Sequence, residues 1–195
     1  MFNVLMFSAN NTRNLETAVF GSGCFWCTEA VFQELRGVVS VVPGYAGGLT
    51  DNPTYQQVSG GATGHAEVIK VEFEPGQISY QDLLTVFFAT HDPTTPNRQG
   101  DDVGTQYRSI ILYANEDQKK QSENFIKNLN ESSAAGEPVI TEVKPLGNFY
   151  EAEEYHHNFY RKNQDQPYCQ IVINPKLEKL QKQFGALLKS HSKIK

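Results

Sequence analysis

The chain has 195 residues, of which 39% are hydrophobic and 11% aromatic, and these proportions suit one domain with a buried core. Its formal net charge of −5 and its lack of a basic run with interleaved aromatic residues argue against a nucleic-acid-binding protein. No apolar stretch has the length of a membrane span, and the short apolar N-terminus lacks a signal peptide's basic region and cleavage site. Three cysteines, a low and odd number, argue against a disulfide scaffold and favour a reducing, cytoplasmic location.

The hydrophobic pattern predicts an irregular N-terminal extension over residues 1–16 and a single domain over residues 17–195, ending in an ordered helix. Strands are predicted for residues 17–20, 38–42, 67–73, 107–113 and 139–143, and helices for residues 24–35, 79–90, 115–129, 151–162 and 174–189. Pro43-Gly44 should end the second strand, and residues 44–64 and 91–104 should form long loops. This mixture, without an internal repeat, predicts an α+β two-layer sandwich with a mixed sheet.

Cys24 lies where the first predicted strand gives way to the first predicted helix. The residues Gly21-Ser22-Gly23 before it predict a tight turn. A cysteine near a helix N-terminus faces free N–H groups and the positive end of the helix dipole, which favour the reactive thiolate. Phe25 and Trp26 follow directly and would form an apolar wall. The stretch therefore predicts a reactive sulfur beside a small apolar pocket.

Cys27 follows Cys24 at Cys-X-X-Cys spacing. Such a pair at a helix start is typical of redox chemistry. A zinc site would need four ligands, and Cys169 and His65 could complete one, although their spacing matches no common zinc pattern. Cys27 could equally be a buried core residue, because free cysteine often fills apolar space.

Acidic residues at three other places could take part in chemistry. Glu67 begins a strand with an apolar interior, so its carboxyl is either a proton donor with a raised pKa or a solvent-facing strand end. Asp101 and Asp102 stand between glycines, where turn chemistry explains them best. Glu153 and His156 have a spacing found in carboxylate metal helices, but acids in the first turn of a helix explain them more simply. His65 is expected to hydrogen-bond only locally.

Several blocks, in order over roughly residues 17–180, resemble the A-type peptide methionine sulfoxide reductases. These blocks are Gly23-Cys24-Phe25-Trp26 with Glu29, Pro43-Gly44-Tyr45-Ala46-Gly47-Gly48, Asn52-Pro53-Thr54-Tyr55, Thr63-Gly64-His65-Ala66-Glu67, His91-Asp92-Pro93-Thr94, residues 99–109 and residues 149–156. The resemblance implies a two-layer α+β sandwich on a ferredoxin-like arrangement. It also implies reduction of the S epimer of methionine sulfoxide, free or in proteins.

The resemblance also implies roles for single residues. Cys24 matches the nucleophile, and Glu67 matches the acid that protonates the sulfoxide oxygen. The positions that match the substrate pocket are Phe25 and Trp26 for the methyl group, Tyr55 and Tyr107 for the oxygen, and Asp102. The attack leaves a sulfenic acid on Cys24, which a second thiol resolves and thioredoxin or another dithiol finally reduces, with no metal or organic cofactor.

The resolving thiol is where the sequence departs from the family pattern. Cys169 matches the resolving position, but the flexible glycine-rich tail that would let it reach Cys24 is not evident. Cys27, one helical turn from Cys24, is an alternative, and direct reduction of the sulfenic acid by an external thiol is a third. The pattern slightly favours Cys169.

Three other functions remain consistent with the residues alone. A thioredoxin-like dithiol oxidoreductase would use Cys24 with Cys27. A thiol hydrolase would use Cys24 with His65. A structural domain with a zinc-bound cysteine would have no catalytic activity.

Overall fold

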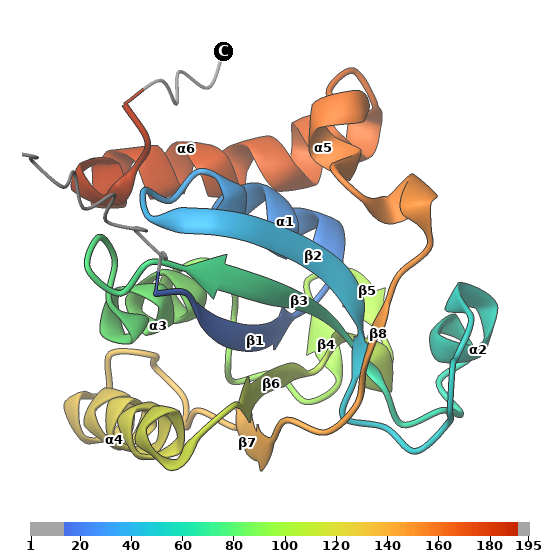
Figure 1. Ribbon diagram of the computed structural model, residues 1–195, viewed down its shortest axis with the longest axis horizontal. Helices are drawn as coiled ribbons and strands as arrows, with labels where there is room; N and C mark the ends of the chain where they lie inside the picture. The colour runs from blue at the N-terminus through green and yellow to red at the C-terminus, as the bar shows by residue number, and fades with distance from the viewer. Residues whose placement is uncertain (1–13, 191–195) are drawn as a thin grey trace, which may run out of the picture.

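The computed structural model describes residues 14–190 (Figure 1), so the predicted extension over residues 1–16 lies almost entirely outside the described residues. The strands are β1 (Glu16–Ser22), β2 (Val38–Ala46), β3 (Ala66–Phe73), β4 (Arg98–Gln99), β5 (Asp102–Val103), β6 (Ser109–Tyr113), β7 (Glu142–Pro145) and β8 (Phe149–Glu151). The α-helices are α1 (Phe25–Gln33), α2 (Tyr55–Ser59), α3 (Tyr80–Ala89), α4 (Glu116–Ser132), α5 (Phe159–Lys162) and α6 (Asn174–Phe184), and a π-helical turn (Cys169–Ile173) leads into α6.

Six strands form one curved sheet in the order β7-β6-β1-β3-β2-β8. Every neighbouring pair is antiparallel except β6 and β7, which are parallel. The fold is therefore α+β with a mixed sheet, as the pattern predicts. Strands β4 and β5 form a separate two-stranded ribbon within the expected loop of residues 91–104. None of the helices within residues 14–190 is long and apolar enough to cross a membrane.

The main core lies between the sheet and the helices α1 and α3. The Phe20 ring on β1 lies 5.4 Å from the Phe32 ring on α1 and 5.1 Å from the Phe87 ring on α3, so one sheet residue joins both helices. Helix α6 packs beside α1 with Leu177 and Leu180 buried in the same core (Figure 1). This packing fixes the start of α1 relative to the sheet and to the C-terminal part of the chain.

Most helix boundaries follow the capping residues. The Ser79 side chain accepts the Asp82 N–H, and the Asp82 carboxylate accepts the Ser79 N–H, which confirms the predicted start of α3. The Asn115 side chain accepts the Gln118 N–H and so caps α4. The same chemistry forms α2, where Thr54 and Gln57 make a capping box inside residues 44–64, a segment predicted to be a loop.

The second strand does not end at Pro43-Gly44. Strand β2 continues to Ala46, so that prediction is wrong. The Pro43 carbonyl accepts the Ala152 N–H, and both polar groups of a strand residue in an antiparallel pair face the same neighbour. The missing N–H of Pro43 therefore faces the end of β8, so the proline removes no hydrogen bond between β2 and β3.

The predicted helix over residues 151–162 is also wrong. Residues 149–151 form strand β8, Glu154–His156 form a 3-10 turn, and only Phe159–Lys162 are α-helical. Asn158 has a left-handed φ of 54°, and its N–H donates to Glu29 Oε1 at 2.8 Å. A contact with α1 thus breaks the helical pattern.

Two other strands begin later than predicted. Strand β6 starts at Ser109 because Thr105–Tyr107 form a 3-10 turn. Strand β7 starts at Glu142, because the N–H groups of Val139 and Ile140 donate to Asn130 Oδ1 and to the Pro93 carbonyl instead of to the sheet.

Candidate active site

Cys24 occupies the N-cap position of α1, as its place in the sequence predicts. Its carbonyl accepts the N–H groups of Cys27 at 3.2 Å and Thr28 at 3.4 Å, which begins the helix. Gly23 has a φ of +92°, and a Cβ there would lie 2.6 Å from Gln99. Glycine at this position lets the β4–β5 ribbon pack against the turn that carries the cysteine.

The helix start does not favour a Cys24 thiolate in the free protein, contrary to the expectation. Burial, a side-chain hydrogen bond with Cys27 and the neighbouring Glu67 raise the pKa of Cys24 above its usual value. The same hydrogen bond lowers the pKa of Cys27 to about 7. Burial therefore favours the neutral thiol at Cys24, and the interaction between the two sulfurs favours the thiolate at Cys27.

Glu67 lies at the start of β3, directly beside the end of β1 that leads to Cys24. A Cβ added to Gly21 would lie 2.9 Å from the Glu67 carbonyl, which shows how closely the two strands approach. The Glu67 side chain is 2% exposed, so the solvent-facing alternative is wrong. Its Oε2 accepts the Phe25 N–H at 3.0 Å, one residue after Cys24.

Burial raises the pKa of Glu67 to about 8, and the hydrogen bond from Phe25 only partly opposes the rise. At neutral pH the carboxyl therefore carries its proton most of the time. A neutral carboxylic acid held beside a cysteine is a proton donor for a group that binds between them.

Two aromatic residues follow Cys24 and form a rigid apolar wall. The Phe25 side chain is buried, with its ring 6.3 Å from that of Trp26. The Trp26 indole stacks on Phe159 with ring centroids 3.6 Å apart, and its Nε1 donates to His156 Nδ1 at 3.1 Å. Because α5 and the 3-10 turn before it hold the indole on two sides, its plane is fixed without substrate.

Tyr55, Tyr107 and Asp102 lie close enough to Cys24 and Glu67 for their charges to interact. Burial raises the pKa of both tyrosines, and the charges of Glu67, Cys24 and Asp102 add to the rise. Both hydroxyls therefore keep their protons and can donate hydrogen bonds. Burial also raises the pKa of Asp102, which accepts a hydrogen bond from Tyr168 at 3.4 Å.

Tyr168, which the sequence did not indicate, and Glu153, which it indicated only for a possible metal site, complete the surroundings. The Tyr168 hydroxyl lies 3.5 Å from Cys27 Sγ and also hydrogen-bonds Cys24. The Glu153 carboxylate accepts from the Tyr45 hydroxyl at 2.8 Å and from the Tyr55 N–H at 2.9 Å. Tyr168 is separated from the two sulfurs by more than 140 residues of chain, so only the tertiary structure reveals its place.

The two sulfurs of Cys24 and Cys27 open on one cavity of about 320 Å³. Its other lining residues are Gln99, Gly100, Asp101, Asp102, Tyr168, Ile171, Val172 and Lys176. The cavity connects the cysteine pair with the β4–β5 ribbon and the start of α6.

The zinc and hydrolase interpretations find no support within residues 14–190. His65 Nδ1 accepts the Gly48 N–H, and its Nε2 is hydrogen-bonded to the Thr50 carbonyl, so His65 bonds only locally, as expected. No group of three or more metal-ligating side chains comes together among these residues. His156 and Glu153 are used by Trp26, Tyr45 and Tyr55 instead of by a metal.

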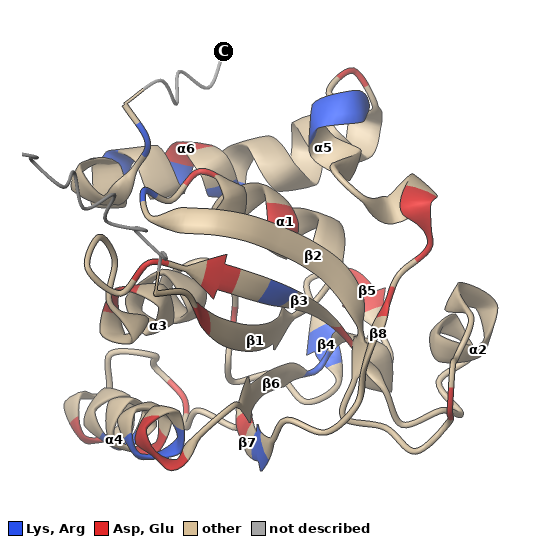
Figure 2. Ribbon diagram, in the orientation of Figure 1, with Lys and Arg blue, Asp and Glu red and all other residues tan. Residues whose placement is uncertain are grey.

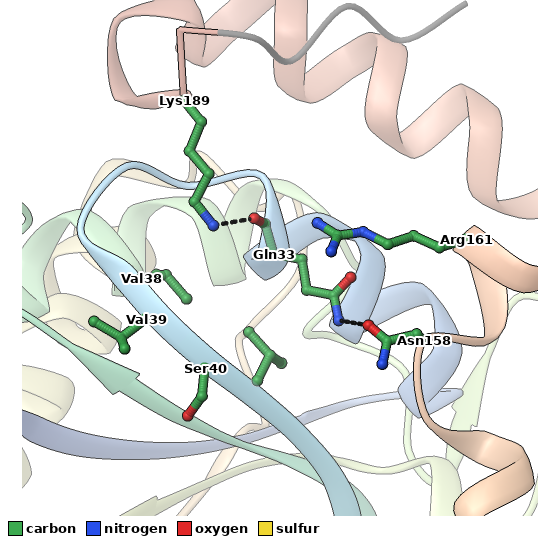
Figure 3. A pocket seen from close by; sticks show the side chains of 8 residues that line it. Gln33, Val38, Val39, Ser40, Asn158, Arg161 and Lys189 are labelled. Carbon is green, nitrogen blue, oxygen red and sulfur yellow. Dashed lines mark hydrogen bonds between the residues drawn. The ribbon is translucent and has the colours of Figure 1, made fainter.

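A second pocket, of about 220 Å³, lies away from the cysteines (Figure 3). The Lys189 ammonium donates to the Gln33 carbonyl, and the Gln33 side chain donates to Asn158, which joins α1, α5 and the C-terminal segment around it. Figure 2 shows Lys and Arg positions spread over several elements, among them α4, α5, α6, β3, β4 and β7, instead of gathered on one. These features hold the fold together and supply no reactive group.

Fold and site together define a cysteine-dependent enzyme in which a buried neutral acid and an aromatic wall adjoin the sulfur. The family model described as Peptide methionine sulfoxide reductase matches residues 16–188. The peptide methionine sulfoxide reductase MsrA of Sulfolobus acidocaldarius is 58% identical over 87% of this chain and 96% of its own. The chain belongs to the peptide methionine sulfoxide reductase family, and it is a thiol-dependent oxidoreductase of type A.

Solved structures agree with this assignment. Methionine sulfoxide reductase A of Corynebacterium diphtheriae superimposes with a TM-score of 0.74 at 36% identity, over 78% of this chain and 77% of its own. Mxr1 from Saccharomyces cerevisiae in complex with Trx2 superimposes with a TM-score of 0.52 at 25% identity, over 74% of this chain and 84% of its own.

Proposed function

We propose that this chain reduces the S epimer of methionine sulfoxide, free or within proteins, with Cys24 as nucleophile and Glu67 as proton donor. The observation that carries the assignment of roles is the position of Glu67. Its carboxyl is buried, holds its proton at neutral pH and is hydrogen-bonded to the backbone of the residue after Cys24. A sulfoxide becomes an electrophile when its oxygen is protonated, so an acid and a nucleophile must meet the same group from two sides.

The first step transfers the oxygen to Cys24. Glu67 gives its proton to the sulfoxide oxygen while the Cys24 sulfur attacks the sulfoxide sulfur. The oxygen passes to Cys24, methionine leaves, and the thiol proton of Cys24 replaces the one that Glu67 gave. The net change is a thiol and a sulfoxide converted to a sulfenic acid and a thioether.

The surrounding side chains bind the substrate. Phe25 and Trp26 contact the methyl group, because a fixed aromatic wall favours an apolar substituent over a charged one. The hydroxyls of Tyr55 and Tyr107 donate hydrogen bonds to the sulfoxide oxygen, and Asp102 supplies a polar edge of the same pocket. The pocket distinguishes the two epimers because it binds the sulfoxide oxygen on one side and the methyl group on the other.

Regeneration requires a dithiol. The sulfenic acid condenses with a second thiol, Cys27 or Cys169, and thioredoxin or another dithiol reduces the resulting disulfide. The crystallised complex of the yeast relative Mxr1 with Trx2 supports thioredoxin as the reductant. This chemistry needs no metal or organic cofactor.

We also propose a ferredoxin-like core in a two-layer sandwich. The connection β1-α1-β2-β3-α3-β6 alternates strand, helix and hairpin, and its four strands lie in the order β6-β1-β3-β2. Residues 17–195 form one catalytic domain in this proposal, supported by the single main core that joins β1, α1, α3 and α6. Reliance on free thiols favours a reducing compartment such as the cytoplasm.

The proposal is tested with each purified epimer of a blocked methionine sulfoxide and dithiothreitol as reductant. The wild type should turn over the S epimer only, and Cys24→Ser should produce no methionine. A well-folded wild type that reduces neither epimer would overturn the proposal, and disulfide substrates would then be tested.

A further inference from the structure

We propose that Cys27, not Cys169, resolves the sulfenic acid on Cys24, through a disulfide between Cys24 and Cys27. This inference rests on the proposed function of Cys24. All three cysteines are free and buried in the structure, so burial alone does not distinguish the candidates. Their partners do.

The two residues of the Cys-X-X-Cys pair lie in the first turn of α1 and line the same cavity. Cys24 is the N-cap of α1 and Cys27 is its third residue, and each thiol shifts the pKa of the other. Residues three apart at a helix start have Cβ atoms about 5–6 Å apart. A disulfide needs Cβ atoms about 3.5–4.5 Å apart, so closing the bridge requires a small tightening of the first turn of α1 and leaves the rest of the helix in place.

Cys27 is also the better nucleophile at neutral pH. In the reduced protein the pKa of Cys27 is lowered to about 7, first through Cys24, and the Lys176 charge and the Tyr168 hydroxyl, which remain in place when Cys24 is oxidised, lower it further. Burial raises the pKa of Cys169. Since the thiolate is the attacking form and the best attacking thiols have a pKa near the ambient pH, Cys27 is the more reactive of the two.

Cys169 is held away from the reaction by its own helix. It is fully buried in the main core with Ile173, Leu177 and Leu180, whereas Ile171, two residues further along, is exposed. Its neighbour Tyr168 points to the cysteine pair instead, and the cavity beside the two sulfurs is lined by Tyr168 and Val172 but not by Cys169. For Cys169 to reach Cys24, the π-helical turn before α6 would have to unwind and expose that apolar packing.

The resolving step forms the disulfide and releases water. The Cys27 thiolate attacks the Cys24 sulfur, the bond between that sulfur and oxygen breaks, and the departing hydroxide takes a proton from the adjacent Glu67 or Tyr168 to leave as water. The Cys24–Cys27 disulfide then accepts two electrons from an external dithiol. Because the thiolate with the lower pKa leaves more readily, the external thiol attacks Cys24 and displaces Cys27.

The first experiment is a single turnover without reductant. Wild-type enzyme is mixed with the S epimer, methionine is quantified, free thiols are titrated, and the disulfide is mapped by peptide mass spectrometry. We expect two thiols lost for each methionine formed and a peptide that links Cys24 to Cys27. A Cys24–Cys169 link would overturn the inference, whereas the absence of any methionine would overturn the proposed function instead.

Two matched cysteine variants extend the test to the full cycle. Cys27→Ser should still form methionine once and leave a sulfenic acid that dimedone traps, while its turnover with thioredoxin falls by about two orders of magnitude. Cys169→Ser should keep turnover with thioredoxin. A Cys27→Ser enzyme that still turns over normally with thioredoxin would overturn the inference, and Cys27→Ala repeats the measurement if the serine variant fails to fold.

Discussion

Replacement of Glu67 by glutamine should make the protein more stable while it removes most of the activity. Glutamine has almost the same shape, and its amide oxygen can still accept the Phe25 N–H. It cannot ionise and it is not an acid. The change therefore removes the proton donor and the buried titratable group together, and the two consequences have opposite signs.

The stability change follows from the raised pKa. Glu67 has a pKa of about 8 in the folded protein against 4.5 for an unperturbed glutamate, so unfolding releases a proton between these pH values. The stabilising contribution of the neutral carboxyl is fully present below about pH 4.5 and is lost as the pH rises through about 8. At about 1.36 kcal/mol for each pH unit, the advantage of Glu67→Gln should grow by about 3 kcal/mol between pH 4.5 and pH 7.

The assay is urea denaturation of both proteins at several pH values, so that all other titrating groups cancel in the difference. A difference in unfolding free energy that does not change with pH would show that the carboxyl is ionised in the fold, and the reasoning would fail. In parallel, kcat/KM for the S epimer should fall by about 10²- to 10⁴-fold at pH 7, the usual contribution of a positioned acid. An active Glu67→Gln enzyme would place the acid elsewhere.

Other predictions test the remaining parts of the argument. Wild-type kcat/KM should decline as the pH rises through about 8, because Glu67 loses its proton there, and a profile flat to pH 9 would contradict this. Tyr107→Phe should lower kcat/KM by about ten-fold through one lost hydrogen bond, and an unchanged value would remove Tyr107 from the pocket. Gly23→Ala should cost about 1–3 kcal/mol in thermal unfolding because of its φ of +92° and its contact with Gln99, and a neutral result would mean that the ribbon shifts freely. Ser79→Ala should cost about 1 kcal/mol with activity unchanged, which makes it a control for general destabilisation.

The sequence predicts those parts of the fold that depend on neighbouring residues. Ser79 and Asp82 start α3, Asn115 starts α4, and Cys24 comes at the start of α1, because capping and turn chemistry act over three or four residues. The strands with strong β-branched or alternating patterns are likewise near their predicted places. The motifs, in their order along the chain, are also enough to identify the family, because these short blocks together contain most of the predicted site residues.

Predictions fail where distant segments supply the hydrogen bonds. Pro43 remains inside β2 because β8 ends beside it, about 110 residues further along the chain. Residues 151–158 are not helical because Glu153 binds Tyr45 and Tyr55, and because the Asn158 N–H binds Glu29 on α1. No local pattern contains that information.

By itself, the sequence determined the position of the reactive cysteine at a helix start, the acid at a strand start and the class of reaction. The tertiary structure alone decided their protonation, because the pKa of Cys24, Cys27 and Glu67 depends on burial and on the groups brought beside them. It also decided that Tyr168, but not Cys169, faces the cysteine pair. Both outcomes depend on how α6 packs on α1, and long-range packing of this kind cannot be read from residue types along the chain.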